Sequence, residues 1–229
     1  MAPLIVALAG ALAFLAGRAL ELDWLCFWSK PIPVLALLYW LRGFPAGAYR
    51  RWIGTGLWLS LAGDILLEWP ADLFVFGLGA FLLAHLAYLR AYLLDTRRLA
   101  PLPLLAAAIT GAVIFSLLAS GGLGALLVPV ACYALAISAM LWRALARLGT
   151  GVDRRSAQLA AIGAVLFVLS DSLIGINRFV APFDAASYLI ILSYWLGQWG
   201  IAASARSTAR AVPGSEIPPA PPGEIGYSK

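Results

Sequence analysis

Charged residues are scarce in this chain. Only 12% of its 229 residues are Asp, Glu, Lys or Arg, whereas 62% are hydrophobic, and the mean hydropathy is +0.90. A soluble domain with this composition would have far too little polar surface to cover its core. The composition therefore excludes a soluble globule and predicts a membrane protein.

Cysteine and histidine are almost absent as well. Cys26 and Cys132 lie in apolar runs without CxxC or Cys/His spacing, so we expect small buried hydrophobic residues rather than a disulfide framework. His85 is the single histidine. No His/Glu metal motif and no Gly-rich phosphate loop is present, so the sequence predicts neither a metal nor a cofactor, although Asp64, His85 and Asp171 are a conceivable ligand set.

Apolar runs of membrane-spanning length fill most of the chain. A span needs about 20 residues, and we place eight, at about residues 4–20, 25–41, 52–68, 73–93, 101–119, 123–143, 157–179 and 183–203. The prediction is an all-α fold, a polytopic transmembrane bundle of eight helices in residues 1–204. Residues 1–20 lack the basic start of a signal peptide, so we expect a retained first helix. Residues 205–229 are rich in Pro and Gly and predict a disordered cytoplasmic tail.

The basic residues follow alternate spans. One side of the membrane receives Arg42, Arg50, Arg51, Arg90, Arg97, Arg98, Arg143, Arg147, Arg154, Arg155, Arg206, Arg210 and Lys229, and the other side only Arg18, Lys30 and Arg178. By the positive-inside rule, both termini are expected in the cytoplasm. The net charge of +5 thus indicates topology rather than a nucleic-acid partner. We expect a multi-pass protein of a bacterial inner membrane or an equivalent membrane.

Three ionisable side chains fall inside predicted spans. A membrane-embedded aspartate costs about 2.5 to 3.5 kcal/mol on insertion scales, so Asp64, His85 and Asp171 are expected to face the protein interior. LAGDILL at 61–67 resembles VLSDSLI at 168–174, in the third span of each half. A four-plus-four duplication would therefore place the two aspartates in equivalent positions, facing each other across a pocket.

Several polar residues in the spans also have purely structural interpretations. An interhelical hydrogen bond would explain His85, and tyrosines in spans commonly pack as core or interface aromatics. Lys30 and Arg178 lie near helix ends, where long side chains extend their charges to the interface. The fifth and sixth spans carry little besides apolar residues, so we expect them to be scaffold.

Four motifs, taken in order, resemble the YhhN-type lysoplasmalogenase family. They are GDILL at 63–67, GLGAFLLAHLAYL at 77–89, SDSLIGINRF at 170–179 and YWLGQ at 194–198, preceded by the Lys30-Pro31 pair. The resemblance covers about residues 25–204. It implies an eight-helix membrane hydrolase that cleaves the vinyl (alkenyl) ether of lysoplasmalogens, giving a fatty aldehyde and glycerophosphoethanolamine or glycerophosphocholine. The implied partner is a lysophospholipid within the bilayer; the sequence does not indicate the oligomeric state.

The resemblance also implies site residues. The residues that match polar positions of the family are Lys30, Asp64, His85, Tyr88, Asp171, Asn177, Tyr194 and Gln198. Asp64, Asp171 and His85 are the expected catalytic residues, and the other five are expected to bind substrate. Lys30 or Arg178 would hold the lysolipid phosphate.

Vinyl ether hydrolysis suits a pair of buried carboxyl groups. It begins with slow protonation of the β-carbon, which generates an oxocarbenium ion that water attacks. Burial disfavours a charged carboxyl group and two close carboxyl groups cannot both ionise cheaply, so one of Asp64 and Asp171 would donate the proton while the other stabilises positive charge. The carboxylate or neutral His85 would deprotonate the water.

The main alternative is a proton-coupled transporter or lipid scramblase in which Asp64, His85 and Asp171 form a relay. Its expected sign is a helix broken by Gly or Pro near the midplane in both halves of the chain. No paired break is clear in the sequence. The motifs therefore favour the hydrolase.

Overall fold

In the computed structural model, which describes residues 2–207, the regular secondary structure is entirely helical. The α-helices are α1 (Ala2–Ala19), α2 (Asp23–Ser29), α3 (Ile32–Leu41), α4 (Ala48–Glu68), α5 (Phe74–Asp95), α6 (Pro101–Ser120), α7 (Leu127–Ala146), α8 (Arg154–Phe179) and α9 (Ala186–Ser204), joined by the short 3-10 turns η1 (Gly124–Leu126), η2 (Arg147–Gly149) and η3 (Ala205–Ser207). The predicted all-α fold is confirmed. Most of the predicted tail, with Arg210 and Lys229, lies outside the described residues.

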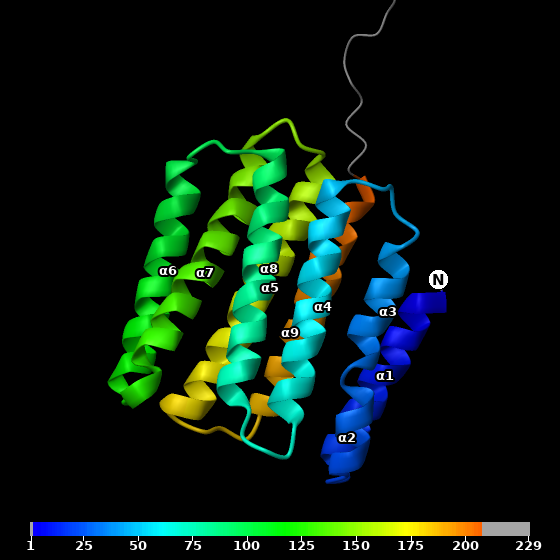
Figure 1. Cartoon of the computed structure of the whole chain (residues 1–229), viewed down its shortest axis with the longest axis vertical. Helices are drawn as coiled ribbons and strands as arrows, with labels where there is room; N and C mark the ends of the chain where they lie inside the picture. The colour runs from blue at the N-terminus through cyan, green and yellow to red at the C-terminus, as the bar shows by residue number, and fades with distance from the viewer. Residues whose placement is uncertain (1, 208–229) are drawn as a thin grey trace, which may run out of the picture.

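The helices run up and down as one antiparallel bundle in which α2 and α3 form a single interrupted pass (Figure 1). Six passes are long and apolar enough to span a membrane: α1, α2 with α3, α5, α6, α7 with its flanking turns, and α8. The two others are more polar, because α4 carries Arg50, Arg51, Asp64 and Glu68, and α9 contains several Ser and Tyr residues and Gln198. The chain is thus an integral membrane protein, and the two passes outside this group of six carry Asp64 and Gln198.

The interruption of the second pass was not predicted. Lys30 N still donates to Cys26 O, but Pro31 and Pro33 have no backbone N–H to donate, so the hydrogen-bond ladder stops after Lys30 although the dihedral angles stay helical through Pro31. The ladder resumes when Leu35 N donates to Pro31 O. The single predicted span at 25–41 is therefore two helices.

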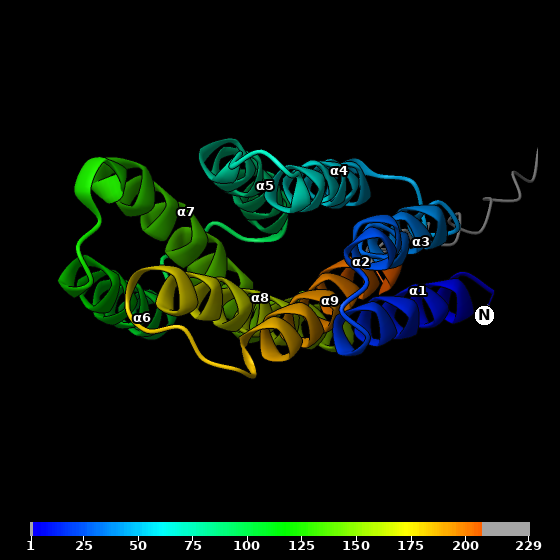
Figure 2. The same ribbon diagram turned by 90° about the horizontal axis from the view of Figure 1, so that it is seen from below.

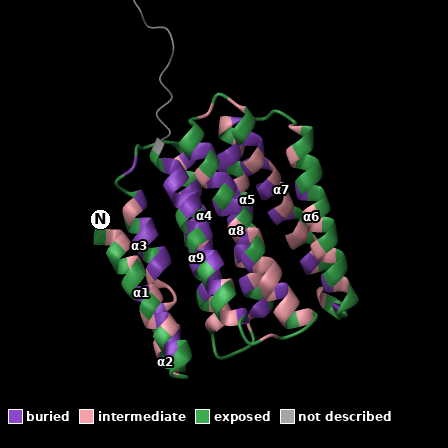
Figure 3. Ribbon diagram, turned by 180° about the vertical axis from the view of Figure 1, so that it is seen from behind, coloured by how far each residue is buried: buried purple, intermediate pink, exposed green. Residues whose placement is uncertain are grey.

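Two helix pairs face each other at the centre of the bundle. Seen from below, α4 and α5 lie opposite α8 and α9, with α7 on one side and α2 and α3 on the other (Figure 2). α1 and α6 are peripheral: α1 packs on α2 and α3, and α6 packs mainly on α7. Buried residues gather on the central helices, whereas α6 is largely exposed (Figure 3). Cys26 is buried as expected, but Cys132 is exposed on α7, so the expectation for Cys132 was wrong.

Backbone contact holds α8 and α9 together. Gly163 of α8 lies against Gly197 and Gly200 of α9, and a Cβ atom on Gly163 would come within 2.7 Å of Ile201 N and 2.8 Å of Gly197 O. Only glycines permit this approach, which is typical of helix pairs in membranes. The contact fixes where α8 presents Asp171 and α9 presents its polar residues.

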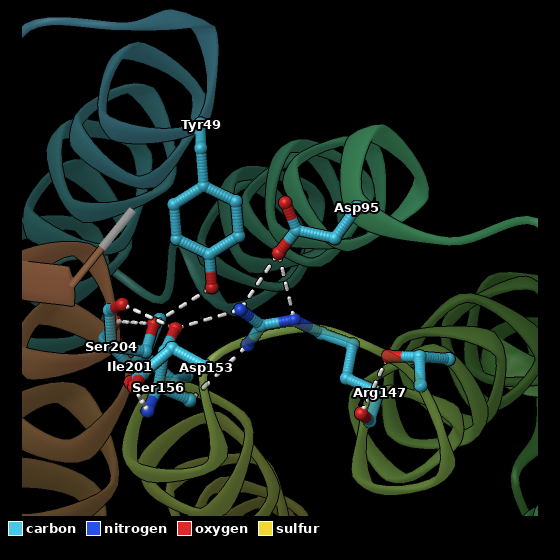
Figure 4. A network of polar contacts seen from close by, with 8 residues as sticks. Tyr49, Asp95, Arg147, Asp153, Ser156, Ile201 and Ser204 are labelled. Atoms are coloured by element: carbon cyan, nitrogen blue, oxygen red, sulfur yellow. Dashed lines mark hydrogen bonds and ion pairs between the residues drawn. The ribbon is translucent and has the colours of Figure 1, made fainter. Parts of the chain in front are cut away.

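A buried ion pair fastens the arginine-rich end of the bundle, where η2, the α5–α6 loop and the start of α8 meet (Figure 4). The Arg147 guanidinium is fully buried and contacts Asp95 Oδ2 through Nη2 at 2.7 Å and Nε at 3.0 Å. Its Nη2 also donates to Ser156 Oγ at 2.8 Å, and its Cζ lies 4.8 Å from the centre of the Tyr49 ring. Ser156 Oγ in turn donates to Ser204 O, so one arginine connects α4, α5, α8 and α9.

Candidate functional site

Asp171, His85 and Tyr133 meet inside the bundle, from α8, α5 and α7. The Tyr133 hydroxyl donates a hydrogen bond to Asp171 Oδ2. His85 Nε2 lies 3.1 Å from the same oxygen and 2.8 Å from the Tyr133 hydroxyl. His85 is fully buried and the Asp171 side chain is 9% exposed. Within residues 2–207, Asp171 Oδ1 has no hydrogen-bond partner, so one oxygen of the carboxyl group is held and the other is available.

The second aspartate belongs to a separate polar group. Asp64 on α4 is buried and accepts a hydrogen bond of 2.6 Å from the Tyr194 hydroxyl of α9. Tyr88 of α5 donates to Gln198 Oε1 at 2.7 Å and lies 3.4 Å from Ser60 Oγ. Polar side chains of α4, α5 and α9 therefore meet in the bundle, and within this group Tyr88 and Gln198 bond to each other.

Aromatic rings separate the two aspartates. The Phe167 ring packs edge-on against His85 at 4.8 Å and against Tyr194 at 5.4 Å between centroids, and Phe81 packs against both Phe167 and Tyr194. In the described part of the chain, no hydrogen bond links Asp64 to Asp171. The two carboxyl groups thus occupy neighbouring centres with different partners, rather than facing each other across an open pocket.

Two apolar cavities, each of about 50 Å³, adjoin at Asp171. The first lies between α6, α7 and α8 and is lined by residues such as Thr110, Ile137 and Val168. The second extends toward the end of the bundle that holds the α4–α5 and α8–α9 loops, and Phe74 and Phe179 line it. Both cavities are lined by Leu118, Val130, Tyr133 and Asp171, and Asp171 is the only carboxyl group in either lining.

The predicted substrate-binding residues lie elsewhere. Lys30 Nζ makes an ion pair of 2.6 Å with Glu68, and Asn177 Oδ1 accepts a hydrogen bond from Phe183 N in the α8–α9 loop. None of Lys30, Tyr88, Asn177, Tyr194 and Gln198 lines the two cavities beside Asp171. Their binding of substrate stays a prediction.

Tyr133 is the site residue that sequence reasoning missed. The expectation that the sixth span is only scaffold was wrong, because α7 supplies this hydroxyl group to both Asp171 and His85. A signal was present: Tyr133 lies well inside an apolar helix, where a buried hydroxyl group needs a partner. Nothing in the sequence named that partner.

The arrangement is suited to moving a proton. Among residues 2–207, no cluster of three or more His, Cys, Asp or Glu side chains is placed to hold a metal ion. Asp171 lines an apolar cavity, and its Oδ2 atom contacts Tyr133 and His85. A carboxyl group in this setting can give a proton to an apolar ligand and stabilise the charge that follows.

Several known proteins are similar to this chain in sequence. The model of the YhhN family matches residues 25–205. A protein of Mycobacterium bovis named lysoplasmalogenase is 42% identical over 163 residues, which are 66% of this chain and 58% of that protein. Human lysoplasmalogenase TMEM86B is 35% identical over 187 residues, covering 81% of this chain and 77% of the human protein, and human lysoplasmalogenase TMEM86A is 33% identical over 193 residues. The chain thus covers less than two thirds of its mycobacterial relative. No solved structure matches it.

Proposed function

Because the chain belongs to the YhhN family, we propose that it is a lysoplasmalogenase, which hydrolyses the alkenyl ether of a lysoplasmalogen to a fatty aldehyde and a glycerophosphoethanolamine or glycerophosphocholine. Relatives named lysoplasmalogenase, at 32–42% identity, support this activity. The structural observation that carries the proposal is the position of Asp171, where two apolar cavities meet beside a tyrosine and a histidine. A lipid vinyl ether needs such a place, because an acid must reach a carbon atom that lies among hydrocarbon.

Asp171 acts first as the acid and then as the base. Its protonated Oδ1 gives a proton to the β-carbon of the vinyl ether, and the ether oxygen supplies electrons to form an oxocarbenium ion. Water attacks the α-carbon while the Asp171 carboxylate takes a proton from it, which restores the acid. The resulting hemiacetal collapses to the aldehyde and the free glycerol hydroxyl. One water molecule is consumed, and Tyr133 and His85 stabilise the carboxylate formed in between.

Asp64 supports this chemistry from the neighbouring centre. Its carboxyl group, held by Tyr194, lies beyond the rings of Phe81 and Phe167 from the reacting atoms. Negative charge at this distance stabilises the oxocarbenium ion without contacting it, because the apolar surroundings screen charge poorly. The proposed roles of the two aspartates are therefore unequal: Asp171 is the acid and Asp64 the electrostatic partner.

The transporter alternative is less well supported. It needs helices that are interrupted near the midplane in both halves of the chain. In the described residues the second pass is interrupted at Pro31, but α8 runs without a break from Arg154 to Phe179 past Asp171. The helix that holds the principal acid is thus continuous, which favours a fixed catalytic group over a moving relay.

We also propose the orientation of the bundle. An even number of passes puts both ends of the described chain on one side, together with the α3–α4, α5–α6 and α7–α8 connections. These connections and the helix ends that adjoin them hold most of the arginines, and the positive-inside rule assigns them to the cytoplasm. Arg178 and Asp72 then lie toward the opposite face.

The test is aldehyde release by the purified full-length protein in detergent. We expect aldehyde from an alkenyl lysophospholipid and none from the matching acyl lysophospholipid, which has no vinyl ether. Asp171→Asn should lower kcat by at least about a hundredfold, the range of a lost general acid. Asp184→Asn, in the exposed α8–α9 loop, is the matched control and should leave kcat unchanged. A wild-type protein that releases no aldehyde contradicts the proposal.

A further inference from the structure

We propose that α8 carries a two-part binding site for a single-chain phospholipid, in which Arg178 binds the phosphate and the cavity between α6, α7 and α8 holds the hydrocarbon chain. Asp171 lies between the two parts. This inference rests on the proposed function and adds to it the way the substrate lies in the protein. It also assigns the phosphate to Arg178 rather than to Lys30.

Three groups along α8 follow the order of the groups in a single-chain phospholipid. Arg178 is seven residues from Asp171, which corresponds to about 10.5 Å of helix rise and about 20° short of two full turns. The two side chains therefore share one face, about two helical turns apart. Val168, on the other side of Asp171, lines the cavity between α6, α7 and α8. Phosphate, ether and chain thus map onto successive positions of one helix.

Arg178 can exchange its present partner for a phosphate. Its ion pair with Asp72 is 3.4 Å long, and the two side chains are 40% and 76% exposed. Exposed ion pairs of this kind contribute little, so a phosphate that accepts paired hydrogen bonds can replace Asp72. Lys30, by contrast, is 14% exposed and only 2.6 Å from Glu68. A phosphate there would have to displace a closer and better buried partner.

Arg178 also lies against two rings that line the second cavity. Its Cζ lies 3.9 Å from the centre of the Phe74 ring and 6.0 Å from that of Phe179. Both rings line the cavity that leads to Asp171. A phosphate bound by Arg178 would therefore place the glycerol unit between these rings and the vinyl ether at Asp171.

The first cavity and a neighbouring groove provide a path for the hydrocarbon chain. Beyond Asp171 the first cavity follows α6 from Leu118 to Thr110, a rise of about 12 Å. Its volume of about 50 Å³ is too small for a whole lipid chain, but an apolar groove of about 510 Å³ between α6 and α7 shares Gly111 and Ser138 with it. The chain can thus pass from the cavity into this groove, on the flank where α6 makes most of its contacts with α7 alone.

Chain-length selectivity tests the apolar part. Thr110→Trp would fill the far end of the cavity, and Ile109→Trp, on the 54% exposed neighbouring residue outside both cavities, is the matched control. We expect Thr110→Trp to lower the ratio of kcat/KM for C18 over C10 alkenyl lysophospholipids about tenfold, the effect of roughly two methylene groups losing burial. Ile109→Trp should leave the ratio unchanged. An unchanged ratio in folded Thr110→Trp, or equal shifts in both variants, overturns the assignment.

A substrate without phosphate tests the polar part. Arg178→Gln should lower kcat/KM for the alkenyl lysophospholipid about tenfold or more, and leave it unchanged for the alkenylglycerol that lacks the phosphate, since a hydrogen bond to a charged group is lost only in the first case. Arg18→Gln, near the same end of the bundle, is the control. The quantity compared is the ratio of kcat/KM for the alkenyl lysophospholipid to kcat/KM for the alkenylglycerol. If Lys30→Gln lowers this ratio and Arg178→Gln does not, the assignment of the phosphate is wrong.

Different outcomes contradict the proposed function and the two-part site. Absence of aldehyde from every alkenyl substrate with wild-type protein contradicts the proposed function itself. Aldehyde release with selectivity ratios that are the same in wild type, Thr110→Trp and Arg178→Gln leaves the function in place and contradicts the two-part site. Thermal unfolding of each variant in detergent establishes that it is folded before the ratios are compared.

Discussion

The carboxyl group of Asp171 has two unlike oxygens. Oδ2 receives the Tyr133 hydroxyl and lies beside His85 Nε2, whereas Oδ1 has no such partner in the described part of the chain. A carboxylate formed by proton transfer is stabilised by the hydrogen bond that it already accepts, so the surroundings need not rearrange during the reaction. The buried Nδ1 of His85 also has no hydrogen-bond partner among residues 2–207.

Removal of the Tyr133 hydroxyl tests this arrangement. Tyr133→Phe keeps the ring and deletes the hydrogen bond to Asp171, which is worth roughly 1.5 to 3 kcal/mol for a charged acceptor, so kcat should fall about ten- to a hundredfold. KM should change little, because the hydroxyl group acts on the acid rather than on the substrate. Steady-state aldehyde release measures both constants. Tyr188→Phe, on a partly exposed tyrosine of α9, is the control, and a rise in KM with kcat intact would show that Tyr133 only binds substrate.

At the residue scale, the sequence predicted the ionisable groups but not their pairing. Asp64, His85 and Asp171 were recognisable because each is costly in a membrane. Their partners depend on which helices are neighbours, and periodicity within one helix carries no such information. Tyr133 and Phe167 illustrate this: one completes the Asp171 centre and the other separates it from Asp64, yet both look like ordinary core residues in the sequence.

At the element scale, the close contact of α8 with α9 sets the positions of Asp171 and Tyr194. Gly163→Ala would place a Cβ atom 2.7 Å from Ile201 N and 2.8 Å from Gly197 O, and neither backbone atom can move without shifting a helix. We expect a loss of roughly 1 to 3 kcal/mol of stability, the range for overpacking. Thermal unfolding in detergent measures it. Gly79→Ala on α5, where nothing lies within 4 Å of the added Cβ, should not lower the midpoint; equal effects of both variants would contradict the contact.

The ion pair of Arg147 and Asp95 joins helices that are distant in the chain. Asp95→Leu leaves a buried arginine without its counter-charge, a change that typically costs about 3 to 5 kcal/mol. The double variant Asp95→Leu with Arg147→Met removes both charges and should be clearly more stable than Asp95→Leu alone. The unfolding midpoints of wild type, Asp95→Leu, Arg147→Met and the double variant form a double-mutant cycle. Additive losses would mean that the two side chains do not act as a pair.

Element boundaries were largely predictable, and the exceptions have local causes. Length and hydropathy located the passes because each must cross the same thickness of lipid. The break at Pro31 was missed because an apolar run shows where a pass lies, and not whether its hydrogen-bond ladder is continuous. The burial of Arg143 and Arg147 was missed too. A count of charges treats every arginine near a helix end as exposed to water, but these two arginines are buried inside the protein.

At the scale of the whole molecule, the two halves of the chain repeat one pattern of contacts. In the first half α1 packs on α3 and α4 on α5, and in the second half α6 packs on α7 and α8 on α9. The halves then meet through α5 with α7 and through α3 with α9. Asp64 of α4 bonds to Tyr194 of α9, and Asp171 of α8 contacts His85 of α5, so the two polar centres occupy corresponding positions. This is the pattern that a four-plus-four duplication predicts, although the two aspartates differ in their surroundings: Asp171 lines two cavities, whereas Asp64 is buried against Tyr194.

The orientation of the whole bundle follows from its charges and is directly testable. Arg97, in the α5–α6 connection, and Asp184, in the α8–α9 connection, are both exposed and lie at opposite ends. In a background of Cys26→Ser and Cys132→Ser, a single Asp184→Cys should react with a membrane-impermeant maleimide on intact cells, whereas Arg97→Cys should react only after the membrane is permeabilised. The many arginines at the end of the bundle that holds Arg97 resist translocation across the membrane. We therefore expect this end to stay inside the cell, out of reach of the impermeant maleimide. The reverse labelling pattern would place Arg178 and the proposed phosphate position on the cytoplasmic side and would require the substrate to be supplied from there.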